Sequence, residues 1–253
     1  MAHVTTDTVP TTLLMLTGAH HVGYSFRGGG VAIFLPEEAS MAIQDEIAQS
    51  ALIIIDVQND FCPGGNLAVP EGDRAIPVIN RVSGLFPHVV ATKDWHPEDH
   101  VSFASSHPGK EPTDTVEHGG MTQLLWPDHC VKGTEGAAFH PDLDVRPVNI
   151  VLHKGAKTHL DSYSAFFEND KTTPTGLDSY LKGLGFERVF VVGLAEDVCV
   201  YFTAMDARKL GYRTAVISDA TRGVNIPEGN LDTARRDMEN AGVSYITSAE
   251  LGV

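Results

Sequence analysis

Short runs of hydrophobic residues recur along the chain from residue 51 onward. Six of these runs are rich in β-branched residues and continuously apolar, as is typical of strands buried on both faces of a sheet. The predicted strands cover residues 51–56, 88–94, 148–154, 188–193, 213–219 and 244–247. Segments with helical spacing lie between them at residues 76–85, 175–185, 197–211 and 230–242. The last three end at a glycine, a common signal for the end of a helix.

Strands and helices therefore alternate along the chain. This order predicts an α/β fold of three layers, in which a six-stranded, mainly parallel sheet is covered by helices on both faces. Residues 101–147 do not fit the alternation, because they are rich in Pro, Gly, His and Asp. A connection of this length is rarely passive, so we expect it to contribute to function.

Composition narrows the class of protein. Of the 253 residues, 42% are hydrophobic and 20% are charged, as in soluble globular proteins. The formal net charge of -15 disfavours nucleic acid and anionic membrane surfaces as partners. Three cysteines are too few for a disulfide scaffold, which favours a reducing, cytoplasmic location. No apolar run approaches the roughly 18 residues of a membrane-spanning helix.

Residues 1–46 differ in character from the rest of the chain. They hold a Thr-rich stretch, the apolar segment LLMLTG and a Gly triplet, with Arg27 as the only basic residue. A signal peptide would have a basic start and a longer apolar run, and a transit peptide would carry more arginine. The segment is either a β-rich or flexible extension or translated upstream sequence ahead of Met41. We expect this N-terminal extension to be dispensable and to be followed by one α/β domain over residues 47–253.

Reactive side chains occur at the ends of the first four predicted strands. Asp56, Asp94 and Lys154 close three of them, and Cys199 begins the helix after the fourth. Ligands of open parallel sheets bind beyond the carboxyl ends of the strands, so we expect these groups to converge on one site. Asp56, Lys154 and Cys199 supply a base, a cation that activates the thiol, and a nucleophile. The alternative is a structural ion pair beside a buried, inert cysteine.

A second group of ligand-type residues follows the second predicted strand. In the segment DWHPEDH, Asp94 and His96 are two residues apart, so their side chains point the same way in an extended chain and can share one ion. His129, in LWPDHC, would complete a three-ligand site with open positions for water or substrate. Zinc suits these nitrogen and oxygen ligands best, although iron or manganese would also fit. His100 is either a further ligand or one of twelve histidines that lies near an aspartate by chance.

Five sequence blocks resemble the signatures of one enzyme group. They read ALIIIDVQNDFCPGGNLAV, ATKDWHPEDHVSFA, LWPDHCVKGT, HKGAKTHLDSYSAF and GLAEDVCV, and they cover about residues 50–250. The group is that of the nicotinamidases (pyrazinamidases) within the isochorismatase-like hydrolases. The resemblance implies a catalytic triad and a bound divalent metal. The triad falls on Cys199, Asp56 and Lys154, and the metal ligands fall on Asp94, His96 and His129, with His100 where some members have a further ligand.

The resemblance also implies features of the substrate pocket. A cis peptide bond between Leu194 and Ala195 would direct the backbone amides of Ala195 and Cys199 into an oxyanion hole. The residues that would contact the substrate ring are Phe61, Trp126, Tyr163 and Leu194. The chain departs from the group in two respects, because Val198 replaces an aromatic residue or histidine of some relatives and residues 1–46 have no counterpart.

The activity implied by the resemblance is hydrolysis of nicotinamide to nicotinate and ammonia through a cysteine thioester, a step of NAD salvage, with pyrazinamide also accepted. One alternative is a metal-independent amidase of the same superfamily that acts on a carbamoyl or ureido compound. The other is a non-catalytic ligand-binding protein on this fold. The intact metal-ligand set disfavours the first and the intact triad disfavours the second. A dinucleotide-binding module is also disfavoured, because VQND and not a Gly-rich motif follows the first strand. The sequence does not determine whether identical chains assemble.

Overall fold

A computed structural model describes residues 23–27, 30–34 and 37–253 of the chain. The chain divides into two units between Glu46 and Ile47. In the first, strands β1 (Gly23–Arg27) and β2 (Gly30–Phe34) form an antiparallel hairpin. Helix α1 (Glu37–Ala48) spans the division. The hairpin agrees with the alternative of a β-rich extension, whereas the sequence pattern did not predict α1. The Thr-rich stretch and LLMLTG lie outside the described residues.

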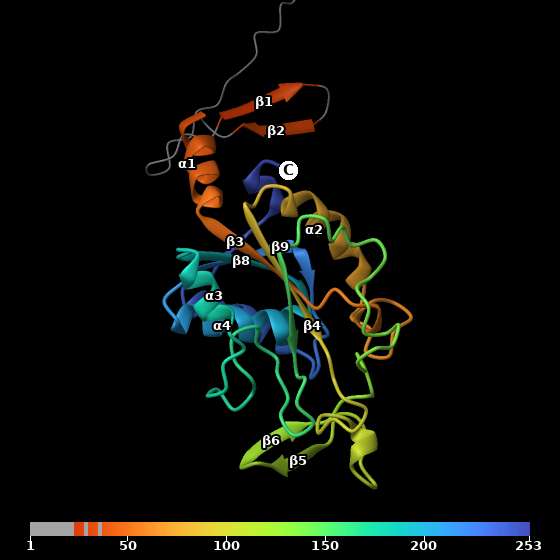
Figure 1. Ribbon diagram of the computed structural model, residues 1–253. Helices are drawn as coiled ribbons and strands as arrows, with labels where there is room; N and C mark the ends of the chain where they lie inside the picture. The colour runs from red at the N-terminus through yellow and green to blue at the C-terminus, as the bar shows by residue number, and fades with distance from the viewer. Residues whose placement is uncertain (1–22, 28–29, 35–36) are drawn as a thin grey trace, which may run out of the picture. The chain divides into compact units, whose positions relative to one another are not determined.

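Six parallel strands form the central sheet of the second unit (Figure 1). They are β3 (Ser50–Ile55), β4 (His88–Asp94), β7 (Ile150–Lys154), β8 (Arg188–Leu194), β9 (Arg213–Arg222) and β10 (Ser244–Ile246). Their spatial order is β10-β9-β8-β3-β4-β7, so the first strand of the domain lies in the middle of the sheet. Every residue of β3 is buried, as its continuous apolar run predicted. The predicted six-stranded parallel sheet is therefore confirmed.

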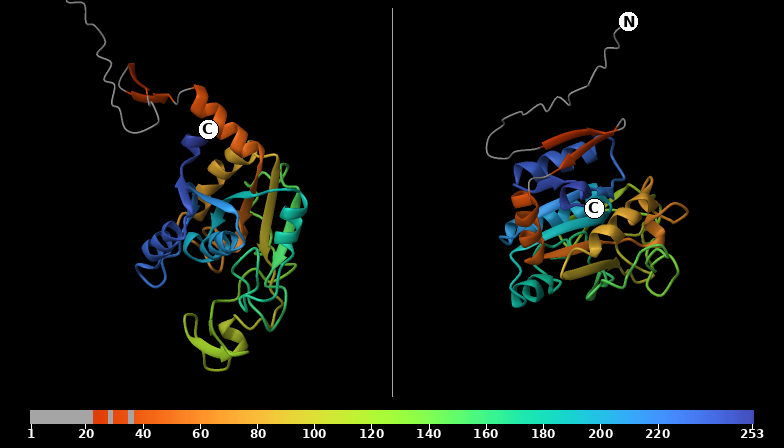
Figure 2. Two further views of the ribbon diagram at one scale, coloured as in Figure 1. Left: turned by 90° about the vertical axis from the view of Figure 1, so that its left-hand side faces the viewer. Right: turned by 90° about the horizontal axis from the view of Figure 1, so that it is seen from above.

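Helices cover both faces of the sheet (Figure 2). Ile53 and Val191 point into one buried cluster with residues of α3 (Leu177–Gly183), α4 (Tyr201–Lys209) and α5 (Asn230–Asn240). On the opposite face, Phe190 of β8 contacts Phe86, which follows α2 (Ile76–Ser83), with ring centroids 5.0 Å apart. The three-layer architecture is therefore confirmed. Short helical turns lie at Asn59–Phe61, Gly72–Ala75, Ala104–Ser106 and Ser248–Leu251.

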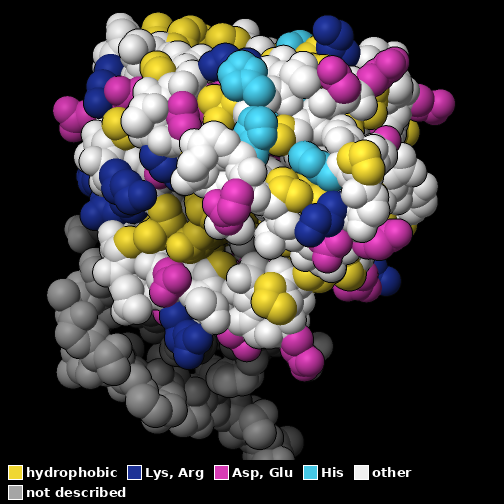
Figure 3. Space-filling view, turned by 90° about the horizontal axis from the view of Figure 1, so that it is seen from below, with side chains coloured by type: hydrophobic (Ala, Val, Ile, Leu, Met, Phe, Trp, Pro, Cys, Tyr) yellow, Lys and Arg dark blue, Asp and Glu magenta, His cyan; other side chains and the backbone are white. Residues whose placement is uncertain are grey.

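The long connection between β4 and β7 is mostly irregular, as predicted. It contains one antiparallel hairpin, formed by β5 (Thr115–His118) and β6 (Met121–Leu124), which the sequence pattern did not predict. Figure 3 shows the molecule from the side of this hairpin. Basic and acidic side chains are interspersed there, and apolar side chains gather in a recess. Among the described residues, no helix is both long and apolar enough to cross a membrane.

Candidate active site

The carboxyl ends of four adjacent strands bring the reactive residues together. Asp56 directly follows β3, while Asp94 and Lys154 are the last residues of β4 and β7. Cys199 lies in a π-helical turn, Glu196–Val200, between β8 and α4. Since β3 is flanked by β8 and β4, and β4 is flanked by β7, these ends share one edge of the sheet. The predicted convergence of the four residues is confirmed.

Lys154 lies at the centre of this cluster and is almost completely buried. Its Nζ lies 2.7 Å from Asp56 Oδ2, contacts Asp94 Oδ1, and lies 3.5 Å from Cys199 Sγ. It also donates a hydrogen bond of 3.1 Å to the carbonyl oxygen of Ser162. Burial alone would lower the pKa of Lys154, but the two carboxylates hold it well above its usual value. The side chain is therefore a permanent cation against the thiol.

Asp56 and Cys199 form the acid–base pair of the cluster. Thr92 donates a hydrogen bond of 2.6 Å from its hydroxyl to Asp56 Oδ1. Burial raises the pKa of Asp56 to about 6, with the charge on Asp94 adding to the rise and Lys154 opposing it. Burial also raises the pKa of the Cys199 thiol well above its usual value, against the effect of Lys154. At neutral pH the thiol is therefore protonated and lies beside a carboxylate that can accept its proton.

Asp94, His96 and His129 form a buried group whose ligand atoms lie within 4.8 Å of one another. Asp94 Oδ2 is 3.6 Å from His96 Nε2 and 3.8 Å from His129 Nε2. The Nδ1 atom of each histidine faces a backbone carbonyl. His96 Nδ1 lies 2.9 Å from the carbonyl oxygen of Gly155, and His129 Nδ1 lies 2.8 Å from that of Pro127. A carbonyl only accepts, so each Nδ1 carries a proton, and Nε2 is the ring atom that faces Asp94 and could bind an ion. This donor set fits a divalent metal ion.

His100 lies behind His96 in a different contact group. Its Nδ1 is 2.7 Å from the Ser102 hydroxyl, its Nε2 is 3.4 Å from the carbonyl oxygen of Leu160, and its ring stacks on His96 with centroids 4.1 Å apart. Its nearest ligand-type neighbours are His96 and Asp161, not Asp94 and His129. Burial, helped by His96, lowers the pKa of His100 to about 4. A role as metal ligand stays a prediction for this residue.

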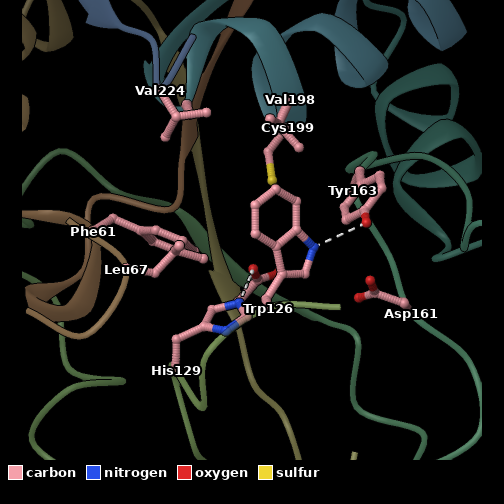
Figure 4. A pocket seen from close by; sticks show the side chains of 11 residues that line it. Phe61, Leu67, Trp126, His129, Asp161, Tyr163, Val198, Cys199 and Val224 are labelled. Carbon is pink, nitrogen blue, oxygen red and sulfur yellow. Dashed lines mark hydrogen bonds and ion pairs between the residues drawn. The ribbon is translucent and has the colours of Figure 1, made fainter. Parts of the chain in front are cut away.

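A pocket that is partly open to solvent lies beside the cluster (Figure 4). Cys199 and Trp126 both line it, and Trp126 Nε1 donates a hydrogen bond of 3.1 Å to the Tyr163 hydroxyl. The pocket is lined by Phe61, Leu67, Asp94, Trp126, His129, Asp161, Tyr163, Ala195, Val198, Cys199 and Val224. Aromatic rings and apolar side chains thus form the walls, while Asp94, His129 and Asp161 supply polar groups. Such a pocket suits a flat ring that carries a polar group.

Two expectations about the turn before Cys199 have different outcomes. The peptide bond between Leu194 and Ala195 is cis, as the resemblance implied, and Ala195 lines the pocket. Leu194 is fully buried and is not among the residues that line the pocket, so its contact with the substrate stays a prediction. Its side chain packs against Gly72, where a Cβ atom would lie 3.2 Å from Leu194 Cδ1.

Comparisons with known proteins agree with this geometry. The sequence pattern of the isochorismatase domain family matches residues 50–250. The chain belongs to the isochorismatase family. A nicotinamidase from Acinetobacter baylyi is 47% identical over 201 residues, which are 79% of this chain and 94% of that protein.

Solved structures of isochorismatase-family members include two informative relatives. A nicotinamidase/pyrazinamidase structure from Acinetobacter baumanii has a TM-score of 0.79 and 51% identity, and the match covers 80% of this chain and 98% of that one. A pyrazinamidase from Pyrococcus horikoshii, solved in complex with zinc, has a TM-score of 0.64 and 34% identity over 79% of this chain and 99% of that one.

Several residues of this isochorismatase-family site were not predicted. Gln58 exchanges hydrogen bonds of 2.8 Å with both backbone groups of Asp94, which fixes the strand end that carries this ligand. Asp161, Leu67 and Val224 line the pocket from loops. Thr92 alternates with Asp94 on β4, so the strand period could have placed it on the same face. The loop residues carry no comparable signal in the sequence.

Proposed function

We propose that this protein is a nicotinamidase, which hydrolyses nicotinamide to nicotinate and ammonia and also accepts pyrazinamide. One observation carries the proposal: Lys154 Nζ lies 2.7 Å from Asp56 and 3.5 Å from the Cys199 sulfur, at a pocket walled by aromatic rings. A base, a cation and a nucleophile in mutual contact are the requirements of covalent amide hydrolysis. The nicotinamidase relatives support the same reaction.

In the first half of the reaction, Asp56 accepts the proton of the Cys199 thiol. Lys154 stabilises the thiolate, which attacks the carboxamide carbon and places negative charge on the amide oxygen. The backbone amides of Ala195 and Cys199 would stabilise that oxyanion, and a well-placed donor of this kind contributes about 3 kcal/mol. Asp56 then gives its proton to the departing nitrogen, so that ammonia leaves and a thioester remains.

In the second half, Asp56 removes a proton from water as the water attacks the thioester carbon. The C–S bond breaks, the proton returns to the Cys199 sulfur, and nicotinate is released. The reaction therefore consumes one water molecule and leaves the triad in its starting state. The thiolate and the water attack the same carbonyl carbon, one after the other. The same two backbone amides would therefore stabilise the oxyanion that forms in each half of the reaction.

Asp94, His96 and His129 would hold a divalent ion, and zinc is the ion that we propose. When bound, the ion would supply a Lewis acid to a ring nitrogen or a water molecule at the polar end of the pocket. The two Nε2 atoms directed toward one carboxylate support this proposal. So does the zinc-bound pyrazinamidase structure.

The substrate is tested by ammonia release from nicotinamide, pyrazinamide, benzamide, glutamine and an N-carbamoyl amino acid. We expect nicotinamide to lead and benzamide to be poor, because benzamide keeps the ring and the carboxamide but lacks the ring nitrogen. If ammonia were released from benzamide as fast as from nicotinamide, the polar end of the pocket would not orient the substrate through its ring nitrogen. If the carbamoyl compound led, the nicotinamidase assignment would be wrong and the protein would be a different amidase of the family.

The nucleophile is tested with Cys199→Ala, which removes only the sulfur. We expect turnover to be abolished, while wild-type protein quenched during turnover shows by mass spectrometry the added mass of a nicotinoyl thioester on the Cys199 peptide. Cys62→Ala is the matched control, since Cys62 is also free and buried but does not line the pocket. Residual activity of Cys199→Ala within tenfold of wild type would show that another group attacks.

A further inference from the structure

The loop between β9 and α5 forms one wall of the pocket. Val224 belongs to this loop and lines the pocket together with Val198, Phe61 and Leu67. In Figure 4 it lies beside the turn that carries Cys199, on the same side as Phe61 and Leu67. The position of this loop therefore determines how much room a ring has next to the attacking sulfur.

Asp197 attaches that loop to the nucleophile turn. Its carboxylate is buried, and it accepts hydrogen bonds from the backbone N–H of Val224 at 2.9 Å and from that of Asn225 at 2.8 Å. Asn230 Nδ2 donates a third hydrogen bond of 3.1 Å to the same carboxylate. Asp197 does not line the pocket itself, and it lies two residues before Cys199. Its side chain thus links the pocket wall to the turn that presents the sulfur.

The loop is also fixed from its other end. Asn225 Oδ1 accepts hydrogen bonds from the backbone N–H groups of Gly229 at 3.0 Å and Leu231 at 3.2 Å, at the start of α5. Gly223 packs so closely that a Cβ atom there would lie 2.8 Å from Leu231 Cδ1 and 2.9 Å from Asp197 Oδ1. The loop therefore has little freedom to move toward or away from the pocket while these contacts hold.

We propose that Asp197 is a positioning residue that sets the width of the ring pocket by holding Val224 against the nucleophile turn. This inference rests on the proposed function, because it assigns the pocket to a ring-shaped amide. Asp197 would act on which rings the enzyme accepts and on their binding, whereas the chemical step depends on Asp56, Lys154 and Cys199. Loss of the Asp197 contacts would widen the pocket without removing a reacting group.

The test is Asp197→Asn, which keeps the size of the side chain but replaces one acceptor oxygen by a donor NH₂ that faces a backbone N–H. We expect the KM for nicotinamide to rise about tenfold, as for the loss of one charge-assisted hydrogen bond, with kcat changed less than about threefold. Across nicotinamides methylated at each ring carbon, kcat/KM relative to nicotinamide should rise about tenfold for at least one position. Unchanged KM and unchanged relative kcat/KM for every ring would overturn the proposal.

Asp219→Asn is the matched control. Asp219 is a second carboxylate that holds a chain segment, since it accepts hydrogen bonds from the Ser248 N–H at 2.8 Å and the Ser248 hydroxyl at 2.5 Å, but it does not line the pocket. The Asp219→Asn substitution should lower the free energy of unfolding without changing kcat/KM for the methylated nicotinamides relative to nicotinamide. The same shift in ring preference in both variants would show that loosening anywhere in the fold is sufficient, and would overturn a specific role of Asp197.

A second variant covers the case in which Asp197→Asn does not fold. Gly223→Ala introduces a methyl group against Leu231 and Asp197, and should displace the loop and shift ring preference in the same direction. A folded Gly223→Ala protein with wild-type ring preference would contradict the proposal.

A measurement without turnover separates this inference from the proposed function. The rate of Cys199 alkylation by bulky N-phenylmaleimide, divided by that with iodoacetamide and followed by peptide mass, should rise about tenfold in Asp197→Asn. Wild-type protein that releases no ammonia from nicotinamide would overturn the proposed function. The ratio of the two alkylation rates would still test whether Asp197 holds Val224 in the pocket wall. An unchanged ratio in an active protein would overturn only the role of Asp197.

Discussion

Replacing Lys154 with Met gives the sharpest test of the charge arrangement in the site. The change removes the ammonium group but keeps a long apolar side chain in a position that is almost completely buried. Lys154 Nζ is 3.5 Å from the Cys199 sulfur, and at an effective dielectric constant of about 20 this separation corresponds to about 5 kcal/mol of attraction to a thiolate. We therefore expect kcat/KM to fall by roughly 10³- to 10⁴-fold.

The same substitution should also destabilise the fold. Without the ammonium group, Asp56 and Asp94 are two buried carboxylates that have lost their shared cation. Breaking a buried ion pair on one side costs about 3–5 kcal/mol in the free energy of unfolding. In the double variant Asp56→Asn/Lys154→Met one of these carboxylates is neutral, so the loss in its free energy of unfolding should be about 2 kcal/mol smaller than the sum of the losses in the two single variants.

Ammonia release gives kcat/KM, and urea unfolding gives the free energy. Lys157→Met is the matched control, because Lys157 is a partly exposed lysine 3.8 Å from Glu168 and should change both quantities little. A Lys154→Met protein with activity within tenfold of wild type and an unfolding free energy within about 1 kcal/mol would refute the reasoning. It would mean that the cation neither supports the thiolate nor balances the two carboxylates.

Two further predictions concern the metal and the N-terminal extension. Wild-type protein purified without added metal should contain about one divalent ion per chain by elemental analysis, and the His129→Ala variant should lose this ion. Wild-type protein without a bound ion would remove the metal site from the proposal. A chain that begins at Met41 should keep nearly all of its specific activity, because every reactive residue named above lies beyond it. An insoluble or inactive truncated protein would show that residues 1–40 are needed by the domain.

The fold and the reacting residues could be predicted because their signals in the sequence are strong. Apolar runs long enough for a strand, with ionisable residues such as Asp56 and Lys154 at their ends, are conspicuous in any chain. Parallel strands then bring such ends to one edge regardless of the details of the loops. The hairpin of β5 and β6 was missed, because its two strands are short and mostly not buried.

The direction of individual side chains was harder to predict. Leu194 precedes Ala195 directly, yet it packs against Gly72 and is not among the residues that line the pocket. His100 lies in the same short segment as His96, yet its ring nitrogens face Ser102 and the backbone of Leu160. Gly72 and Leu160 are distant in sequence from the residues that they contact, so a local pattern contains no information about these contacts.

The triad and the metal-ligand group share one cation, which affects how variants at this site must be interpreted. Lys154 contacts Asp56 and, through Oδ1, also Asp94, so a change at Asp94 alters the electrostatics of the thiol as well as the ligand set. Loss of activity in an Asp94 variant therefore cannot be assigned to the metal alone. His129 approaches Asp94 from the other oxygen, Oδ2, and its Nδ1 is fixed by the carbonyl of Pro127. Replacing His129 removes one ligand while the contacts of Lys154 remain, so the effect of His129→Ala separates the contribution of the ion from that of the triad.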